Sequence, residues 1–455
     1  MPQHTKPLSS VDAAWARMDD AGNAADVVVL MRFAGVVDRS ELERLVASRI
    51  LTRPRFSELV VELPQGLRRP RWAPAAGRVE DHLSCRPLPK PGSEAQLAEL
   101  VSAFISTPFD PNQSPWRLCL VEGLAGGSAL IAHVHHCLGD GFALIQVLLT
   151  MTEELATQEP ATQQGASALT GGDASRPPTP PSGPTKRPSK ALAGLKALGH
   201  VLFLPFDRGT GLRGPLSGER RVAWSRGIAL RTVREVARAR GSTVNDVLLT
   251  ALTGALRTHL RTAGNAGGVR AVIPVNLRSL LAPPEEDSGN YFGLVFVDLP
   301  VEESAAHERF VSIKGQMDRL KASHEAFVTL QLLRLVGQAP LSLARLALRF
   351  FARKASFVVS NVPGPPRPLS LAGRQIRDLM FWVPHPQGLA CGASILSYAG
   401  TIRVGIRTDA AVIAEPQRLA DAFADELDAW LRLTDDVRHP HAPPASKPER
   451  PPIAR

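Results

Sequence analysis

Three histidines and an aspartate, the latter bracketed by two glycines, occur within nine residues: His133, His135, His136, Gly139, Asp140 and Gly141. The apolar run 128–132 precedes them and predicts a strand that delivers the histidines. Side chains alternate between the two faces of a strand, so His133 and His135 share one face and His136 lies on the other. We expect the glycines to permit a turn that a bulkier residue would resist, with Asp140 held just beyond the imidazoles.

Imidazole titrates near neutrality, at about 6.5, and can take a proton from a hydroxyl that attacks an activated carbonyl. A single histidine on an apolar strand is more often structural, but two adjacent histidines followed by Asp-Gly favour catalysis. The alternative is a metal site, since His-x-His beside a carboxylate is a known ligand grouping. Cys137 and Leu138 stand where a dinuclear hydrolase pattern needs aspartate and histidine, so we expect no metal.

Other catalytic motifs are missing from the sequence. It contains no G-x-S-x-G elbow and no P-loop. The segment 209–214 matches G-x-G-x-x-G, but Pro215 follows and no helix pattern begins there, so we predict a loop.

The chain has 455 residues, of which 44% are hydrophobic and 21% charged, as in globular proteins of two or three folding units. The net charge of +10 favours anionic partners. The four cysteines, Cys85, Cys119, Cys137 and Cys391, form neither a zinc motif nor a disulfide framework, which favours a reducing compartment. The sequence shows no secretory signal and no run of about 20 apolar residues, so neither export nor a membrane span is expected.

Composition divides the chain into two halves. We predict an N-terminal subdomain at 1–155, a disordered linker rich in Pro, Ser, Gly and Gln at 156–190, a C-terminal subdomain at 191–436, and a disordered basic Pro-rich tail at 437–455. Periodicity predicts strands at 27–33, 128–135, 270–275, 294–299, 356–360 and 401–406. It predicts helices at 41–50, 94–105, 230–240, 244–260 and 416–433, with Ser242 or Thr243 as the N-cap of the fourth. Strands and helices mix in both halves, which indicates α/β units.

The motif His135-His136-x-x-x-Asp140-Gly141 resembles the HHxxxDG signature of CoA-dependent acyltransferases of the chloramphenicol acetyltransferase and condensation-domain superfamily. Further blocks in the expected order resemble the bacterial wax ester synthase/diacylglycerol acyltransferase family. They are Pro7-Leu-Ser-x-x-Asp12, Asp110 with Pro115-Trp116, Asn245-Asp246, Pro274-Val-Asn276-Leu-Arg278, Gly289-Asn290, Ser360-Asn361-Val-Pro-Gly-Pro365 and Ser397-Tyr398.

The resemblance implies two chloramphenicol acetyltransferase-like subdomains, each a mixed sheet with packed helices, and an active-site channel at their interface. It implies that His136 is the general base, with His135, Asp140 and Gly141 supporting the motif. Asn245, Asp246, Asn276, Arg278 and Asn361 would bind substrate or stabilise structure, and we expect Arg278 to pair with Asp140. The alternative for Arg278 is an exposed side chain.

The implied reaction is esterification of a lipid alcohol by an acyl-CoA co-substrate, with no bound cofactor: diacylglycerol to triacylglycerol, fatty alcohol to wax ester, or both. Two alternatives stay open, a related acyltransferase acting on a polyketide or other specialised alcohol, and a non-catalytic lipid-binding relative. A nucleic-acid partner is not expected, because no recognition motif occurs and two tyrosines offer little base stacking.

Lipid acceptors imply a cytoplasmic protein that sits peripherally on the inner membrane or on lipid inclusions. Arg345, Arg349 and Arg353 recur every four residues among leucines and phenylalanines in the segment 341–354. A basic amphipathic helix of this kind can lie in an anionic interface, although an ordinary packed helix has the same pattern. The segment 191–206 is a second candidate anchor.

Overall fold

The computed structural model describes residues 5–19, 25–63, 66, 68–75, 77–155, 190–207, 211–264, 267–281, 289–385 and 388–438. The predicted linker, except residue 190, and the predicted tail beyond residue 438 lie outside the described residues.

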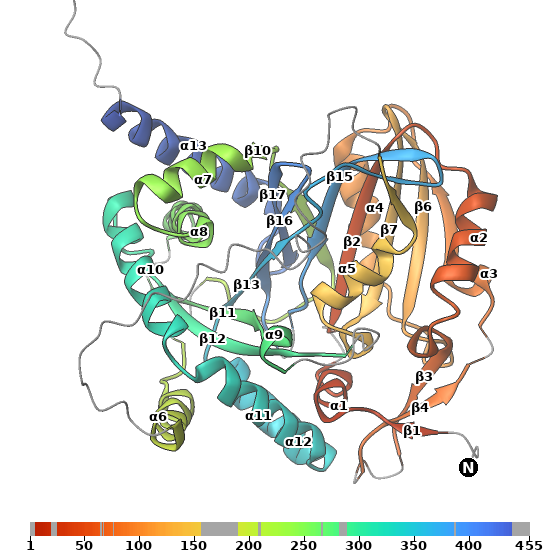
Figure 1. The fold of residues 1–455 in the computed structure, drawn as a ribbon, viewed down its shortest axis with the longest axis horizontal. Helices are drawn as coiled ribbons and strands as arrows, with labels where there is room; N and C mark the ends of the chain where they lie inside the picture. The colour runs from red at the N-terminus through yellow and green to blue at the C-terminus, as the bar shows by residue number, and fades with distance from the viewer. Residues whose placement is uncertain are drawn as a thin grey trace, which may run out of the picture.

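Two seven-stranded mixed sheets form the frame of the molecule (Figure 1). In the first sheet β2 and β7 lie at the centre and pair antiparallel. Its strands, in spatial order, are β5 (Leu83–Pro87), β6 (Trp116–Leu124), β7 (Gly127–His135), β2 (Asp26–Ala34), β15 (Arg374–Trp382), β14 (Leu369–Leu371) and β8 (Thr152–Glu154). A separate three-stranded sheet contains β1 (Lys6–Pro7), β4 (Arg71–Pro74) and β3 (Glu58–Val61).

The second sheet has a parallel centre, because β13 pairs in parallel with both of its neighbours. Its main path is β10 (Ile228–Ala229), β17 (Thr401–Asp409), β16 (Cys391–Tyr398), β13 (Phe357–Pro363), β11 (Val269–Asn276) and β12 (Phe292–Leu299), with β9 (Arg220–Trp224) paired to β17. These sheets and their helices confirm the predicted fold class.

Two strands of the C-terminal half belong to the sheet of the N-terminal half. β15 pairs antiparallel with β2 from Phe33 to Val28, and β14 joins β15 to β8. The division into ranges 1–155 and 191–436 did not predict this exchange, since strand periodicity does not say which sheet a strand joins.

Helices cover both sheets. Those of the N-terminal half are α1 (Ser10–Ala16), α2 (Arg39–Arg49), α3 (Val79–His82), α4 (Glu94–Ser106) and α5 (Gly141–Leu149), with 3₁₀ turns η1 (Pro54–Ser57) and η3 (His136–Leu138). Those that follow are α6 (Lys190–Phe203), α7 (Leu230–Ala239), α8 (Val244–Thr262), α9 (Arg278–Leu281), α10 (Ala306–Lys321), α11 (Glu325–Gln338), α12 (Leu341–Ala352) and α13 (Pro416–Arg438). Among the described helices none is long and apolar enough to cross a bilayer.

Alternation along β2 shows how the sheet separates two cores. Val27 and Val29 pack into the core that contains α1, α5, α11 and α12, whereas Val28 and Leu30 pack against α4 and β9. A third core joins α7, α8, α10 and α13 to the second sheet. The first core contains residues from both sheets, so the interface between the sheets is buried and lined by apolar side chains.

The predicted strands and helices are all present, with ends that shift by a few residues. Thr243 is the N-cap of α8: its side chain accepts from the Asp246 amide, and the Asp246 carboxylate accepts from the Thr243 amide. Gly241 has a φ of 57° and ends the helix before it.

Candidate active site

Strand β7 carries the histidine motif to the interface between the sheets. His135 is its last residue, paired with Asp26 of β2, and the chain then leaves the sheet in η3. The His136 amide donates to the Ala25 carbonyl at 2.7 Å, which fixes the position where the chain turns. His136 thus begins a turn beside the sheet and does not continue the strand.

The His136 imidazole is almost enclosed by aromatic rings. It is 6% exposed, stacks on Trp15 with ring centroids 4.1 Å apart, and meets the edge of Phe292 at 5.6 Å. Burial lowers its pKa to about 4, opposed in part by its own main-chain carbonyl and by the Asn290 amide. The ring is therefore neutral at pH 7. Its Nδ1 atom has no hydrogen-bond partner among the described residues.

A cavity reaches this ring, with a volume of about 980 Å³ that includes the open space at its mouth. β2 and η3 contribute Val27 and His136, β11 and β12 contribute Val272 and Leu294, and β13 contributes Ser360 and Asn361. Both sheets therefore form its walls. The imidazole is buried but not sealed inside packed hydrocarbon.

A second cavity adjoins the first, with a volume of about 720 Å³ that includes the open space at its mouth, and its lining is almost wholly apolar. Both cavities are lined by Trp15, Val272, Leu294 and Leu389. Helices α11 and α12 close the far side of the second cavity. Because the two cavities share these wall residues, the second offers an extended hydrocarbon chain an apolar space that continues from the His136 cavity.

Asp140 is the N-cap of α5 and pairs with Arg278. One carboxylate oxygen accepts from the Ala143 amide at 2.9 Å, and the other accepts from the Tyr291 amide at 3.1 Å. The Arg278 guanidinium lies 3.4 Å from the second oxygen, so the expected contact is present. Burial raises the pKa of the Asp140 carboxyl, while Arg278 and these amides lower it.

The expected glycine turn around Asp140 is not formed. Gly139 has a φ of 168°, which is extended backbone open to any residue, and Gly141 is the first residue of α5. Asp140 makes the turn by capping the helix, so no left-handed residue is needed. Gly141 lines the catalytic cavity, and a Cβ there would meet nothing within 4 Å.

His135 and His133 point away from His136 and engage carboxylates. The Nε2 atom of His135 lies 3.1 Å from Asp19, and its Nδ1 accepts from the Cys137 amide at 3.1 Å. His133 contacts Asp26 through Nε2, and burial lowers the pKa of His133 to about 4. Neither histidine lines the His136 cavity. His133 and His135 lie on the strand as predicted, whereas His136 was expected on its opposite face and instead begins the turn η3.

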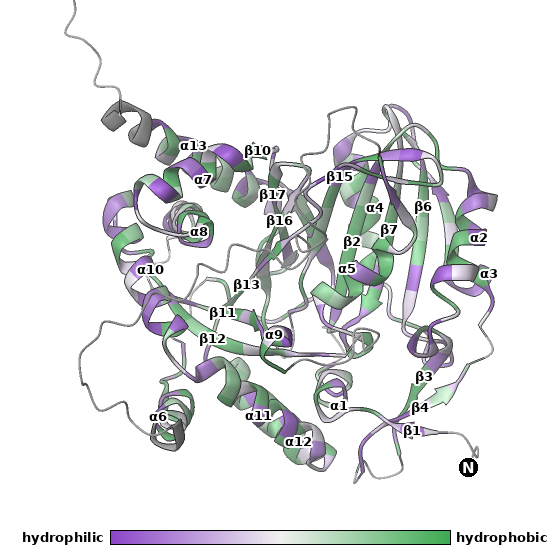
Figure 2. Ribbon diagram, viewed as in Figure 1, coloured by the Kyte–Doolittle hydropathy of each residue, from purple (hydrophilic) through white to green (hydrophobic). Residues whose placement is uncertain are grey.

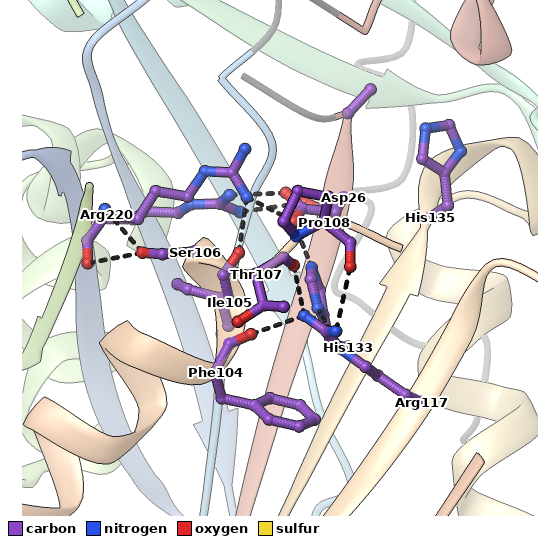
Figure 3. A network of polar contacts seen from close by, with 12 residues as sticks. Asp26, Phe104, Ile105, Ser106, Thr107, Pro108, Arg117, His133, His135 and Arg220 are labelled. Atoms are coloured by element: carbon purple, nitrogen blue, oxygen red, sulfur yellow. Dashed lines mark hydrogen bonds and ion pairs between the residues drawn. The ribbon is translucent and has the colours of Figure 1, made fainter. Parts of the chain in front are cut away.

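Asp26 is the centre of a buried ion cluster shown in Figure 3. Its carboxylate lies 2.6 Å from Arg407 of β17 and 3.2 Å from Arg220 of β9, besides its contact with His133. Burial would raise the pKa of Asp26, but Arg407, His133 and Arg220 together hold it well below the usual range. Because both arginines come from the second sheet, this cluster ties the two sheets together next to the histidine strand.

The four polar residues from the later motifs take different positions. Asn276 and Asn361 line the catalytic cavity. Asn245 does not, but its side-chain oxygen accepts from the Asn361 amide at 3.3 Å. Asp246 caps α8 with Thr243 and is absent from the cavity wall.

Three residues at the site were not predicted to act there: Trp15, Asn290 and Asp12. The Asn290 amide donates to the His136 carbonyl at 2.9 Å and to the Asp12 carboxylate at 2.8 Å. Asp12 is fully buried and lies 3.0 Å from Arg55. Asp12 and Asn290 belong to motifs recognised in the sequence, but only the structure shows that they hold the main chain of His136.

Among the described residues no cluster of three His, Cys, Asp or Glu side chains could hold a metal ion.

Comparison with solved structures defines the class of fold. The wax ester synthase/diacylglycerol acyltransferase from Marinobacter aquaeolei VT8 superposes with a TM-score of 0.67 at 23% identity, covering 94% of this chain and 99% of that one. The first condensation domain of the calcium-dependent antibiotic synthetase gives a TM-score of 0.59 at 15% identity, covering 95% and 97%. The protein therefore has the two-sheet fold of these acyltransferases and condensation domains.

Matches to protein-family models identify the family within this class of fold. The wax ester synthase/diacylglycerol acyltransferase catalytic domain matches residues 8–248, and the WS/DGAT C-terminal domain matches residues 288–430. The chain belongs to the WS/DGAT family and is an acyl-CoA-dependent acyltransferase, as its motifs predicted.

Two curated relatives come from Mycobacterium tuberculosis strain H37Rv. The probable diacyglycerol O-acyltransferase tgs1 is 27% identical over 452 residues, covering 94% of this chain and 96% of the relative. The probable diacyglycerol O-acyltransferase tgs2 is 29% identical over 392 residues, covering 81% and 85%.

Proposed function

We propose that this protein transfers the acyl group of an acyl-CoA thioester to the hydroxyl of a lipid alcohol, with His136 as the general base. The observation that carries the proposal is a neutral imidazole, with a pKa of about 4, in the wall of a cavity between the two sheets. A neutral ring can accept a proton, and a positioned base of this kind typically contributes about 10² to 10⁴ in rate.

Direct transfer from the thioester to the alcohol accounts for every bond and proton, so no covalent acyl-enzyme is needed. The acceptor oxygen attacks the thioester carbonyl carbon while its proton passes to the His136 imidazole. The carbon–sulfur bond then breaks, and the imidazolium returns the proton to the departing CoA thiolate. The products are an ester and free CoA, and the residues of this chain need no metal or bound cofactor for any step.

The surroundings of His136 favour a hydrophobic acceptor and donor. Trp15 and Phe292 cover the ring, and the adjoining apolar cavity offers space for a hydrocarbon chain. Water, the competing nucleophile, is disfavoured by such walls. We therefore place diacylglycerol and long-chain fatty alcohols first among the acceptors.

Lipid acceptors reside in membranes or lipid inclusions, so the proposed reaction takes place at a lipid surface. The net charge of +10 would attract the protein to anionic phospholipid. Such a peripheral position at the inner membrane or at lipid inclusions is part of the proposal.

The test is a purified protein incubated with palmitoyl-CoA and, in separate reactions, dioleoylglycerol, hexadecanol and a polyketide alcohol. Thiol release reports CoA, and chromatography of the lipid extract reports the ester. We expect CoA release that depends on a lipid alcohol and matches ester formed. Release with the polyketide alcohol alone would support a specialised acyltransferase instead, and ligand binding without release would support a non-catalytic lipid-binding protein.

A further inference from the structure

Helices α6, α11 and α12 lie together at one edge of the molecule (Figure 1), and Figure 2 shows hydrophobic and hydrophilic residues on each of them. In the described part of the chain, nine of the thirteen exposed large apolar side chains lie on these helices or just after α6. They are Leu195, Leu202, Phe203, Phe206, Phe327, Leu335, Leu343, Leu346 and Phe350. Phe203 is 87% exposed, which for a phenylalanine is costly in water.

Specific contacts join the end of α6 to α12. The rings of Phe206 and Phe350 meet edge to face with centroids 5.4 Å apart. The buried Lys354 ammonium donates to the Leu202 carbonyl at 3.0 Å, and the Asp207 amide donates to the Arg353 carbonyl at 3.0 Å. The two helices therefore present their exposed side chains as one surface.

We call this surface the docking face and define it by Leu202, Phe203, Phe206, Leu343, Leu346 and Phe350 with Arg345, Arg349 and Arg353.

The charge of the docking face has one sign. The sequence has no aspartate or glutamate from residue 326 to residue 354, a stretch that spans nearly all of α11 and the whole of α12. Residues 190–206 have none either. Arg345, Arg349 and Arg353 are exposed and stand next to Leu346 and Phe350 on α12. Arginines beside exposed apolar side chains on one helix face are typical of helices that lie in an anionic membrane interface.

The inner side of the same helices lines the apolar cavity. Leu348, Phe351 and Ala352 of α12 and Leu333 of α11 form its wall, and Trp15 connects it to the His136 cavity. One helix layer thus separates the docking face from a hydrocarbon-lined space that leads to the reacting atoms.

We infer that the docking face binds an anionic phospholipid bilayer, with Phe203, Leu343 and Leu346 in the acyl region and the three arginines at the headgroups. This inference rests on the proposed function, because it names the surface from which the site takes its lipid alcohol. Bilayer binding places the apolar cavity directly above the lipid.

The experiment is flotation of the full chain with phosphatidylcholine vesicles, with and without phosphatidylglycerol. The test variant is Arg345→Glu/Arg349→Glu. The matched control is Arg234→Glu/Arg238→Glu on α7, a helix far from α12 (Figure 1). In both variants the two changed arginines are four residues apart, and the second lies in the last turn of its helix. Leu343→Ser/Leu346→Ser tests the apolar part, since these side chains are 58% and 67% exposed.

We expect the wild type to float with phosphatidylglycerol vesicles and to release at high salt. The α12 charge variant should bind at least about 25-fold more weakly, since each of the two basic residues near an anionic surface strengthens binding about fivefold. The α7 variant should bind like the wild type, and the leucine variant should bind more weakly than the wild type. Equal binding by the α12 and α7 variants, or no flotation of the wild type, would overturn the inference.

Thiol release with hexanoyl-CoA and a water-soluble alcohol separates the two proposals. All three variants should keep the wild-type rate in this assay, which also shows that they are folded. If the wild type floats as expected but transfers no acyl group to any acceptor, the proposed function fails and the docking face stands. If it transfers acyl groups but does not float, only the docking face fails.

Discussion

At the scale of the residue, the site depends on an imidazole that its surroundings keep neutral. Burial disfavours the protonated ring of His136 and lowers its pKa to about 4. A low pKa makes the ring a weaker base, but it keeps nearly every molecule in the competent form at pH 7. The main chain of His136 is held by Asn290, which Asp12 orients in turn.

The lowered pKa predicts the shape of the pH profile. We expect kcat/KM to be flat from about pH 6.5 to 8 and to fall on the acid side with an apparent pKa well below the ordinary 6.5 of histidine. Stability also falls from pH 6.5 toward 4, because the unfolded state binds protons that the buried His133 and His136 do not. Circular dichroism in the same buffers separates the two effects, and an acid limb at 6.5 or above in folded protein would contradict the assignment.

Asp140 is expected to contribute to stability through the helix cap and the Arg278 pair. Asp140→Ala should lower the free energy of unfolding by about 1–3 kcal/mol, since it removes an N-cap and leaves a partly buried guanidinium without this partner. Asp140→Asn keeps a capping oxygen and should cost less. Urea denaturation measures both, and equal effects would show that the charge alone matters.

At the scale of the element, the site is the meeting point of β7, η3 and α5 from one sheet with β11, β12 and β13 from the other. The sequence predicted these strands from periodicity, but it placed His136 on the strand and not in the turn η3. It could not predict Trp15 on the ring of His136, because α1 reaches the site only after the two sheets pack. The predicted glycine turn was wrong for a local reason: Asp140 caps a helix that begins at once.

The second cavity makes a prediction about chain length. Ala355 lines that cavity but not the catalytic one, and it is 2% exposed. Ala355→Leu should lower kcat/KM for palmitoyl-CoA relative to octanoyl-CoA by at least about tenfold, because the added carbons occupy space that the longer chain needs. Ala239→Leu on the exposed end of α7 is the control. Equal losses with both thioesters would place the acyl chain elsewhere.

At the scale of the whole molecule, two features bind the halves into one unit: the exchanged strands β14 and β15, and the Asp26 cluster. Motif order along the chain predicted the family and hence the two-sheet fold. The partners of Asp26 could not be predicted, because Arg220 and Arg407 lie almost 200 and 400 residues away and nothing in their neighbourhood marks them. The Asp140–Arg278 pair could be predicted, because both residues belong to motifs that were recognised in the sequence.

The cluster predicts a large loss of stability when its only carboxylate is neutralised. Asp26→Asn should lower the free energy of unfolding by about 3–5 kcal/mol, because Arg407 and Arg220 would be left buried without their counter-charge. Glu43→Gln, which breaks the exposed pair with Arg39, is the control and should change little. A small effect of Asp26→Asn in urea denaturation would show that the sheets are held together mainly by apolar packing.

The central claim is that His136 takes the proton from the acceptor, and its most direct test is the rate of acyl transfer by His136→Ala. The matched variant is Cys137→Ala, a change of the next residue, which is also buried. With circular dichroism unchanged, we expect His136→Ala to lose about 10² to 10⁴ in kcat and Cys137→Ala to remain close to the wild type. Near-normal turnover by folded His136→Ala would contradict the account.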